Sequence, residues 1–121
     1  MIRFTIPGEP RTKKNGMRIF QKNGKPFIMP SQQYLEYAEY AGWFVPHEKI
    51  DHPINLKVLY YMGSHRRVDL CNLLEATCDI LVKYHAIEDD SYKYIKGHDG
   101  SRVLYDKEHP RAEIFLEEWD E

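Results

Sequence analysis

The chain has 121 residues, 42% of them hydrophobic, which suffices for one buried core and argues against a two-domain enzyme. Charged residues make up 30% and aromatic residues 13%, a composition that excludes a disordered or low-complexity protein. The net charge of −2 argues against a generic nucleic-acid binder. Apolar runs are only a few residues long, so we expect neither a signal peptide nor a membrane span, and a cytoplasmic location.

The charge is distributed unevenly along the chain. Residues 1–30 contain seven basic residues and one acidic residue, a balance of +6, whereas residues 31–121 contain ten basic and eighteen acidic residues, a balance of −8. A basic segment beside an acidic remainder is typical of an enzyme that binds phosphate and uses a metal. A basic segment that serves solubility alone is the alternative, and composition does not decide between the two.

The first half of the chain predicts strands and one helix. Arg3–Ile6 alternates apolar and polar residues and predicts a short strand, which a polar loop follows. Asn23-Gly24 lies between two short apolar segments and predicts a β-hairpin, because this dipeptide suits a two-residue turn. Ser31 is a candidate N-cap for an amphipathic helix that ends before Pro46.

The second half predicts further strands around a second helix. Ile54–Met62 alternates at first and is then continuously apolar, as expected of a strand at the centre of a sheet. Tyr92–Lys96 and Arg102–Tyr105 flank a turn at Asp99-Gly100 and are interpreted as a second hairpin, and Arg111–Glu117 alternates as a last strand. We therefore expect an α/β or mixed α+β fold in two layers, with helices on a small mixed sheet. Residues 1–121 would form one domain, with a basic loop and β-ribbon at residues 9–29.

The second helix is predicted from Asp69 to about Tyr84. Its core face comprises Leu70, Leu73, Leu74, Thr77, Ile80, Leu81 and Tyr84, and a second face, available for chemistry, comprises Asn72, Ala76, Asp79 and Lys83. Cys71 and Cys78 lie on this helix about 10 Å apart, too far for a disulfide. Two unpaired cysteines are consistent with a reducing compartment.

Six acidic residues lie on or beside this helix: Asp69, Asp79, Glu88, Asp89 and Asp90, with Glu75 between them. Magnesium takes oxygen ligands, usually a few carboxylates with water and substrate phosphate, so these residues are candidate ligands. They can converge only if the loop after the helix folds back along it. The alternative reading is structural, with Asp69 as an N-cap, Asp79 as a solvated residue and Glu88–Asp90 as an acidic turn.

Basic residues near these acids are candidate phosphate contacts. Arg66 and Arg67 precede Asp69, and arginine binds phosphate through two parallel hydrogen bonds. The other candidates lie in the basic segment and are Arg11, Lys13, Lys14 and Arg18. No pair of histidines has the spacing of a zinc site, and no Walker or dinucleotide motif is present, so we expect no nucleotide cofactor.

Three segments together carry a family resemblance: Arg66-Arg67-Val68-Asp69-Leu70-Cys71-Asn72-Leu73, then Asp79-Ile80-Leu81, then Ile87-Glu88-Asp89-Asp90. They resemble the central signature of the RusA family of Holliday-junction resolvases, in which a basic residue precedes Asp-x-Asp-Asn-Leu, a helix carries Asp-Ala-Leu and the next loop ends in Asp-Asp. The resemblance implies a homodimeric endonuclease, dependent on Mg²⁺ or Mn²⁺, that resolves four-way DNA junctions by paired incisions in recombination and repair. It implies catalysis by Asp69, Asp79 and Asp90, and metal binding by these three with Asp89.

Two positions depart from the family signature. The second acid of the Asp-x-Asp pair is Cys71, a poor ligand for magnesium, and the helix lysine of the family is Glu75. Asp79 or Glu75 would supply the missing carboxylate, and Lys13, Lys14 or Lys83 the missing lysine. The rival hypothesis is a module that binds branched DNA without cutting it. A phosphotransfer or RNA-processing enzyme with the same metal chemistry is a third.

Overall fold

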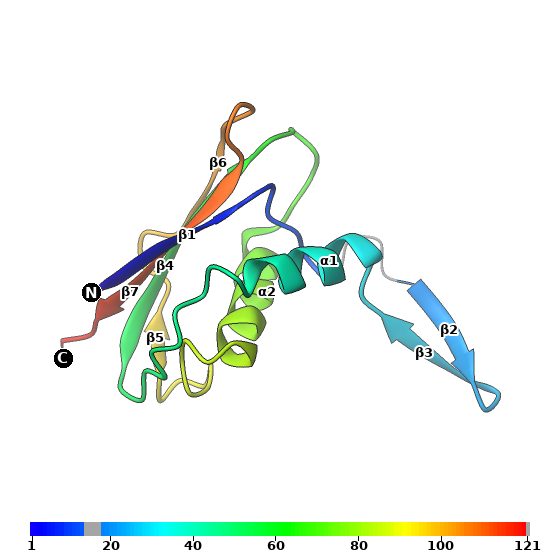
Figure 1. Ribbon diagram of the computed structural model, residues 1–121, viewed down its shortest axis with the longest axis horizontal. Coiled ribbons are helices and arrows are strands. Elements are labelled where there is room, and N and C mark those ends of the chain that lie inside the picture. Colours follow the sequence, from blue (N-terminus) through cyan, green and yellow to red (C-terminus); the bar gives the residue numbers. More distant parts are fainter. Residues whose placement is uncertain (14–17, 121) are drawn as a thin grey trace.

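Strand β4 (Ile54–Met62) lies in the middle of a five-stranded sheet in the computed structural model, which describes residues 1–13 and 18–120. On one side β4 pairs antiparallel with β7 (Arg111–Glu118), which pairs antiparallel with β1 (Ile2–Pro7). On its other side β4 pairs with β5 (Ile95–Gly97) and β6 (Arg102–Tyr105). Figure 1 shows β4 running through the centre of this sheet. The sequence predicted both the bounds of β4 and its central place.

The second hairpin predicted from the sequence is wrong. β5 and β6 do not pair with each other; both run parallel to β4, at its two ends. Asn55 of β4 holds the turn between them, because its side chain donates to the backbone oxygen of Asp99 (3.1 Å) and accepts from the backbone N–H of Asp99 (2.9 Å). Ser101 then accepts a bond from the backbone N–H of Val58 (3.0 Å). These contacts hold the turn against β4, so β6 continues in the same direction as β5. In a hairpin the chain would reverse its direction at this turn.

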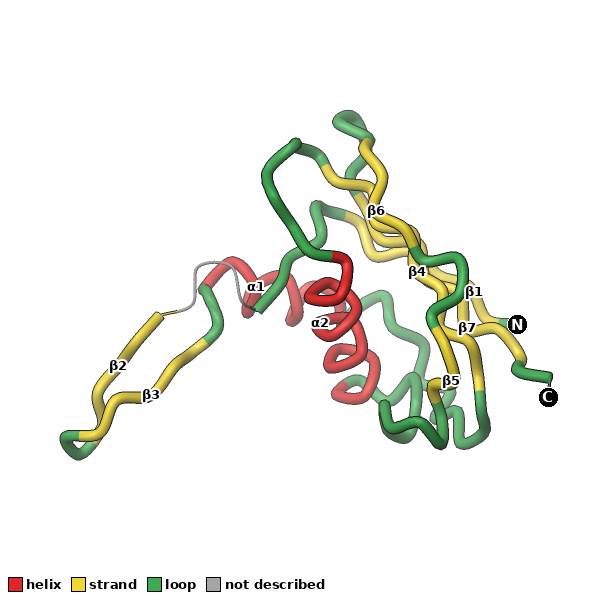
Figure 2. Tube along the Cα trace, turned by 180° about the vertical axis from the view of Figure 1, so that it is seen from behind, coloured by secondary structure: helices red, strands yellow, loops and turns green. Residues whose placement is uncertain are grey.

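Two described helices cover one face of the sheet and form the second layer (Figure 2). Helix α1 (Gln32–Ala41) begins as predicted at Ser31, whose Oγ accepts a hydrogen bond from the N–H of Tyr34 (3.2 Å). Helix α2 (Leu70–Lys83) follows the strand β4 through an exposed loop. This arrangement confirms the expected fold class, a small mixed α/β domain in two layers. Neither described helix is long and apolar enough to span a bilayer.

The buried face of α2 is wider than the sequence pattern predicted. Its buried residues are Leu73, Leu74, Ala76, Thr77, Cys78, Ile80 and Leu81. Ala76, expected on the face available for chemistry, is only 1% exposed. Its direction lies within about 60° of Leu73 and 40° of Ile80 around the helix axis, so its small side chain lies at the edge of the core. Asn72 and Asp79 are half-buried on the remaining part of that face.

The predicted N-terminal hairpin is confirmed. β2 (Arg18–Lys22) and β3 (Lys25–Met29) pair antiparallel, and both turn residues have positive φ, +54° for Asn23 and +75° for Gly24. Positive φ at both central positions is the geometry of a type I′ turn, which asparagine and glycine favour. This hairpin, which we call the arm, projects away from the sheet and the helices (Figure 1).

Candidate active site

Asp69 occupies the N-cap position of α2 with an extended backbone (φ −100°, ψ 130°), but its carboxylate makes no capping bond to the described residues of the helix. The side-chain amide of Asn72 donates to Asp69 Oδ2 at 3.4 Å, a long hydrogen bond that holds the carboxylate toward the helix. Together with Arg67 and Val68 these residues line a hollow of about 320 Å³. The exposed carboxylate of Asp69 is therefore available to a ligand.

Asp90 lies beside α2 because the loop after the helix folds back along it, as the metal-site hypothesis required. The N–H of Glu88 donates to the backbone oxygen of Ile50 (2.9 Å), and Ile87 forms a β-bridge with Ile50. These bonds fix the start of the acidic loop. Asp90 then lines a hollow of about 290 Å³ with residues of α2 and with His98; the α2 residues are Cys71, Leu74, Glu75 and Cys78. Two carboxylates, Asp90 and Glu75, thus face the same hollow.

Asp79 lies one turn of α2 beyond Glu75 and is absent from the described residues that line the two hollows. It follows Asp69 by ten residues, which is about 15 Å along a helix axis. Its Oδ2 atom is shielded from solvent, and the ammonium of Lys13 forms an ion pair with it. Asp89 is exposed and is absent from the described linings of both hollows. The structure therefore brings Asp90 near Glu75 but separates Asp79 from Asp69.

The donors along α2 suit a hard divalent cation better than a soft one. Burial raises the pKa of the Cys78 thiol to about 12, and the nearby charges of Asp90, Asp79 and Glu75 act in the same direction, so this thiol stays protonated at neutral pH. Within residues 1–13 and 18–120, no three His, Cys, Asp or Glu side chains gather as a complete metal cage. Magnesium does not need one, since it is usually bound by one or two carboxylates plus water and substrate phosphate. The hollow shared by Glu75 and Asp90 fits that requirement.

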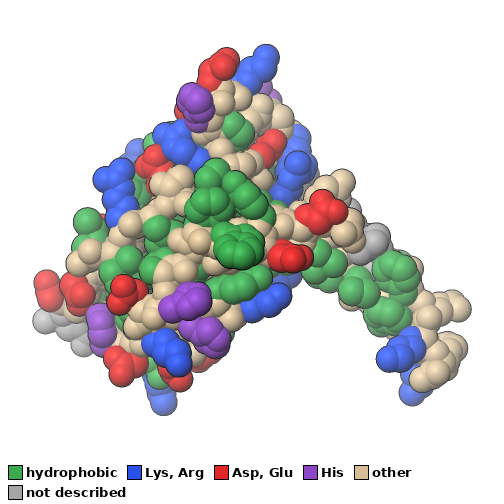
Figure 3. Space-filling model, in the orientation of Figure 1, with side chains coloured by type: hydrophobic (Ala, Val, Ile, Leu, Met, Phe, Trp, Pro, Cys, Tyr) green, Lys and Arg blue, Asp and Glu red, His purple; other side chains and the backbone are tan. Residues whose placement is uncertain are grey.

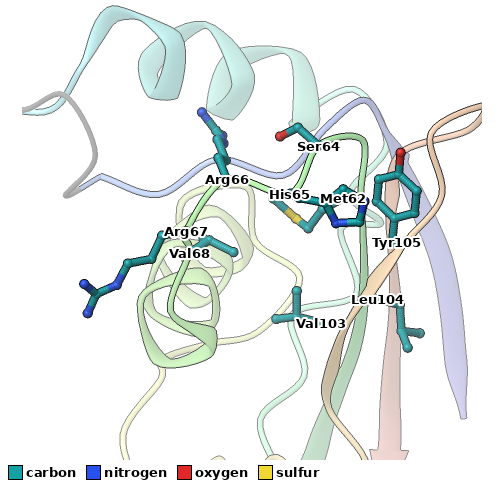
Figure 4. Close-up of a pocket in the computed structure, with 9 residues that line it drawn as sticks. All are labelled: Met62, Ser64, His65, Arg66, Arg67, Val68, Val103, Leu104 and Tyr105. Atoms are coloured by element: carbon teal, nitrogen blue, oxygen red, sulfur yellow. The ribbon is translucent and has the colours of Figure 1, made fainter.

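A third hollow, of about 390 Å³, adjoins the Asp69 hollow and shares Arg67 and Val68 with it. Figure 4 shows its lining, in which the ring of His65 stacks on Tyr105 of β6 with ring centroids 4.0 Å apart. Sequence reasoning missed this pair, because forty residues separate the two rings and only the parallel pairing of β6 with β4 brings them together. The rest of the lining is the apolar Met62, Val103 and Leu104 with Ser64 and Arg66.

The predicted phosphate contacts occupy different settings. Arg67 is exposed beside Asp69, whereas Arg66 pairs with Glu9 at 3.5 Å between Nε and Oε1. Lys13 is held by Asp79, and Arg11 is half-buried. Lys14 lies outside the described residues, and Arg18 is the first residue of β2. Of these residues, Arg67 has the position best suited to hold a phosphate next to a carboxylate.

Comparison with known proteins agrees with this arrangement. The family described as "Endodeoxyribonuclease RusA" matches residues 7–117, which include both carboxylate hollows and both arginines. No curated protein matches the chain. The family match spans nearly the whole chain and includes the segment from Arg66 to Asp90 that carried the resemblance. The chain therefore belongs to the RusA family of endodeoxyribonucleases.

Proposed function

We propose that this protein is a divalent-metal-dependent endonuclease that resolves four-way DNA junctions by paired incisions in recombination and repair. The observation that carries the proposal is the placement of Asp90 and Glu75 in one hollow beside α2, the helix whose N-cap residue is Asp69. Family membership supports DNA as the substrate. An exposed free thiol at Cys71 is consistent with action in the reducing cytoplasm.

The carboxylates of Glu75 and Asp90 would hold Mg²⁺ together with water and substrate phosphate, with Asp69 acting on the same phosphate from the start of the helix, and Mn²⁺ suits the same oxygen donors. When bound, the ion would supply Lewis-acid activation of a water and stabilisation of the leaving oxygen. Glu75 rather than Asp79 would thus replace the carboxylate missing at Cys71. Glu75 lines the hollow with Asp90, and Asp79 does not.

The remaining residues would position the DNA. Arg67 would bind the phosphate next to the scissile bond through parallel N–H bonds, since it adjoins Asp69 and is exposed. The amide of Asn72 would orient Asp69, to which it already donates. Asp79 would hold the basic loop against α2 through Lys13, and Asp89 would keep the potential around Asp90 negative. Arg11, Lys14, Arg18 and Arg66 would add contacts with the DNA backbone.

Glu75 as a ligand is tested by metal binding without DNA. In a Mn²⁺ titration followed by electron paramagnetic resonance, Glu75→Gln and Asp90→Asn should each bind Mn²⁺ about tenfold more weakly than the wild type, or weaker still. Asp79→Asn is the matched control on the same helix and should bind Mn²⁺ like the wild type. Weaker binding in Asp79→Asn with unchanged binding in Glu75→Gln would assign the replacement carboxylate to Asp79 instead.

Paired incision requires two active sites, so we propose that the functional unit is a homodimer. A twofold dimer presents two identical sites to a junction whose opposite arms are related by the same symmetry. The two sites would then cut strands of the same polarity.

The rival function is a module that binds branched DNA with a degenerate site at Cys71 and Glu75. A gel assay with Mg²⁺ or Mn²⁺ separates the two, because an end-labelled four-way junction yields either nicked products or only a shifted band. A panel that adds linear duplex, single-stranded DNA and structured RNA tests the substrate class. Cleavage of the junction in preference to the other substrates supports the proposal. Binding without products supports the rival, and preferred cleavage of RNA would overturn DNA as the substrate.

A further inference from the structure

The arm exposes apolar side chains to water on both of its strands. Ile19 and Ile28 lie directly opposite each other in the β2–β3 register, and 74% and 64% of their surfaces are exposed. Phe20 and Phe27 form a second opposed pair, with stacked rings 5.8 Å apart. A two-stranded hairpin is marginally stable in water unless it packs against something else. The arm therefore has the composition of a segment that is covered in the working protein.

A second exposed apolar surface lies where α1 ends. Trp43 is 85% exposed, and beside it Tyr40 and Phe44 form an edge-to-face pair with centroids 5.1 Å apart. A hollow of about 460 Å³ opens next to Trp43, between α1 and Tyr84. Figure 3 shows hydrophobic side chains gathered on this face of the molecule and on the arm. Contiguous exposed aromatic surface of this kind marks a protein interface.

We propose that the arm of one copy seats on the α1 surface of a second copy, so that two arms are exchanged in a twofold dimer. Ile19 and Ile28 of one copy would cover the surface around Trp43 of the other. The arm cannot cover this surface within one chain, because it leaves the N-terminal end of α1 and runs away from the C-terminal end, where Trp43 lies (Figure 1).

Charge and length support a second copy as the occupant. Residues 19–29 contain two basic residues and no acidic one, whereas α1 contains Glu36 and Glu39 and no basic residue. Strands of five residues span about 17 Å, close to the roughly 15 Å of a ten-residue helix. Twofold symmetry closes the assembly, since each copy gives one arm and receives one, and no arm is left exposed. This inference deepens the homodimer proposed above and does not depend on the DNA chemistry.

The test measures the mass of the full-length protein by sedimentation equilibrium, without DNA or metal. The arm variant is Ile19→Asp/Ile28→Asp and the surface variant is Trp43→Asp; all three side chains are exposed, so the fold of each variant is expected to persist. Each variant alone should dimerise roughly a hundredfold more weakly than the wild type, or not at all. Tyr92→Asp is the matched control, because Tyr92 is as exposed as Ile19 and lies outside both surfaces.

Mixing the two variants gives the decisive measurement. A heterodimer keeps one intact contact, formed by the unaltered arm of the surface variant and the unaltered surface of the arm variant. We therefore expect the mixture to dimerise more tightly than either variant alone and less tightly than the wild type. Restored association also shows that both variants are folded.

Three results would overturn arm exchange. A mixture that stays monomeric would show that the arm does not meet the Trp43 surface. Variants that dimerise like the wild type would leave the homodimer intact but place its interface elsewhere; an arm variant that in addition lost junction affinity would assign the arm to DNA. A wild-type protein that is monomeric at high concentration would overturn both arm exchange and the homodimer, while the nuclease assay remains an independent test.

Discussion

The ammonium of Lys13 forms an ion pair with the carboxylate of Asp79 and so joins the basic N-terminal loop to the middle of α2. The sequence predicted a DNA contact for Lys13 and a metal ligand at Asp79. In the structure these two groups pair with each other. The neighbouring Tyr34 responds to this environment, because burial, followed by the charge of Asp79, raises its pKa to about 12.

The Lys13–Asp79 pair leads to a prediction on salt dependence. Lys13→Ala should leave the logarithmic salt slope of junction binding unchanged, because its ammonium already has an anionic partner. Arg67→Ala should lower that slope by about 0.9, the effect of one lost phosphate contact. Fluorescence anisotropy with a labelled junction at several salt concentrations measures both. Equal losses of slope would show that Lys13 leaves Asp79 to bind DNA.

The same substitution should have a small effect on stability. The side chains of Lys13 and Asp79 are 33% and 39% exposed, and ion pairs of this exposure contribute less than about 1 kcal/mol. Urea unfolding of Lys13→Ala measures the loss. A loss of several kcal/mol would mean that the pair anchors the N-terminal loop far more strongly than its exposure indicates.

Some of the fold follows from local signals in the sequence. Asn23-Gly24 specifies its turn because both residues tolerate positive φ, and Ile54–Met62 has the apolar pattern of a central strand. The parallel pairing of β5 and β6 with β4 could not be predicted in this way. It depends on hydrogen bonds from Asn55 to Asp99, 44 residues apart, and a local pattern carries no information about such a partner.

The site shows the same division. Asp69, Arg67 and Asp90 are candidates from the sequence alone, because their chemistry is visible in the order of residues. The sequence left Glu75 and Asp79 as alternatives, because the proposed choice depends on which side of α2 the acidic loop approaches, and the bonds of Glu88 and Ile87 to Ile50 determine that approach.

The two cysteines should differ in reactivity. Cys71 is exposed, whereas Cys78 is buried and its pKa is raised by that burial to about 12. Native protein should therefore release one equivalent of thionitrobenzoate from Ellman's reagent rapidly at pH 8, and a second only after unfolding in urea. Cys71→Ser is the control and should abolish the rapid phase. Two rapid equivalents in the native protein would contradict the placement of Cys78.

Asp106 should contribute to stability at neutral pH and lose that contribution in acid. Its hydrogen bond from Arg111, then that from the His109 N–H, lowers the pKa of its carboxyl in the folded state. The contribution is complete above the unfolded value of about 3.9 and is lost as the pH falls through the folded value. Urea midpoints of the wild type and Asp106→Asn should therefore converge below about pH 4. A difference that does not change with pH would contradict this.

Gly42 allows α1 to end against Tyr84. A Cβ atom at position 42 would lie 2.5 Å from the ring of Tyr84, so Gly42→Ala should destabilise the protein by about 1–3 kcal/mol through overpacking. Thermal or urea unfolding measures the loss. The double variant with Tyr84→Ala should lose less unfolding free energy than the sum of the losses in the two single variants, because the clash is gone. Full additivity would mean that the backbone relieves the clash elsewhere.

Cleavage of a synthetic four-way junction by Asp69→Asn, in the presence of Mg²⁺, tests the assignment of the active site most directly. The rate of strand cleavage should fall by at least about a hundredfold relative to the wild type, because a neutral amide replaces a carboxylate of the proposed site. Junction affinity, measured by gel shift on the same preparation, should remain within a few fold of wild type, since the basic residues are unchanged. Cleavage by Asp69→Asn at the wild-type rate would contradict the account.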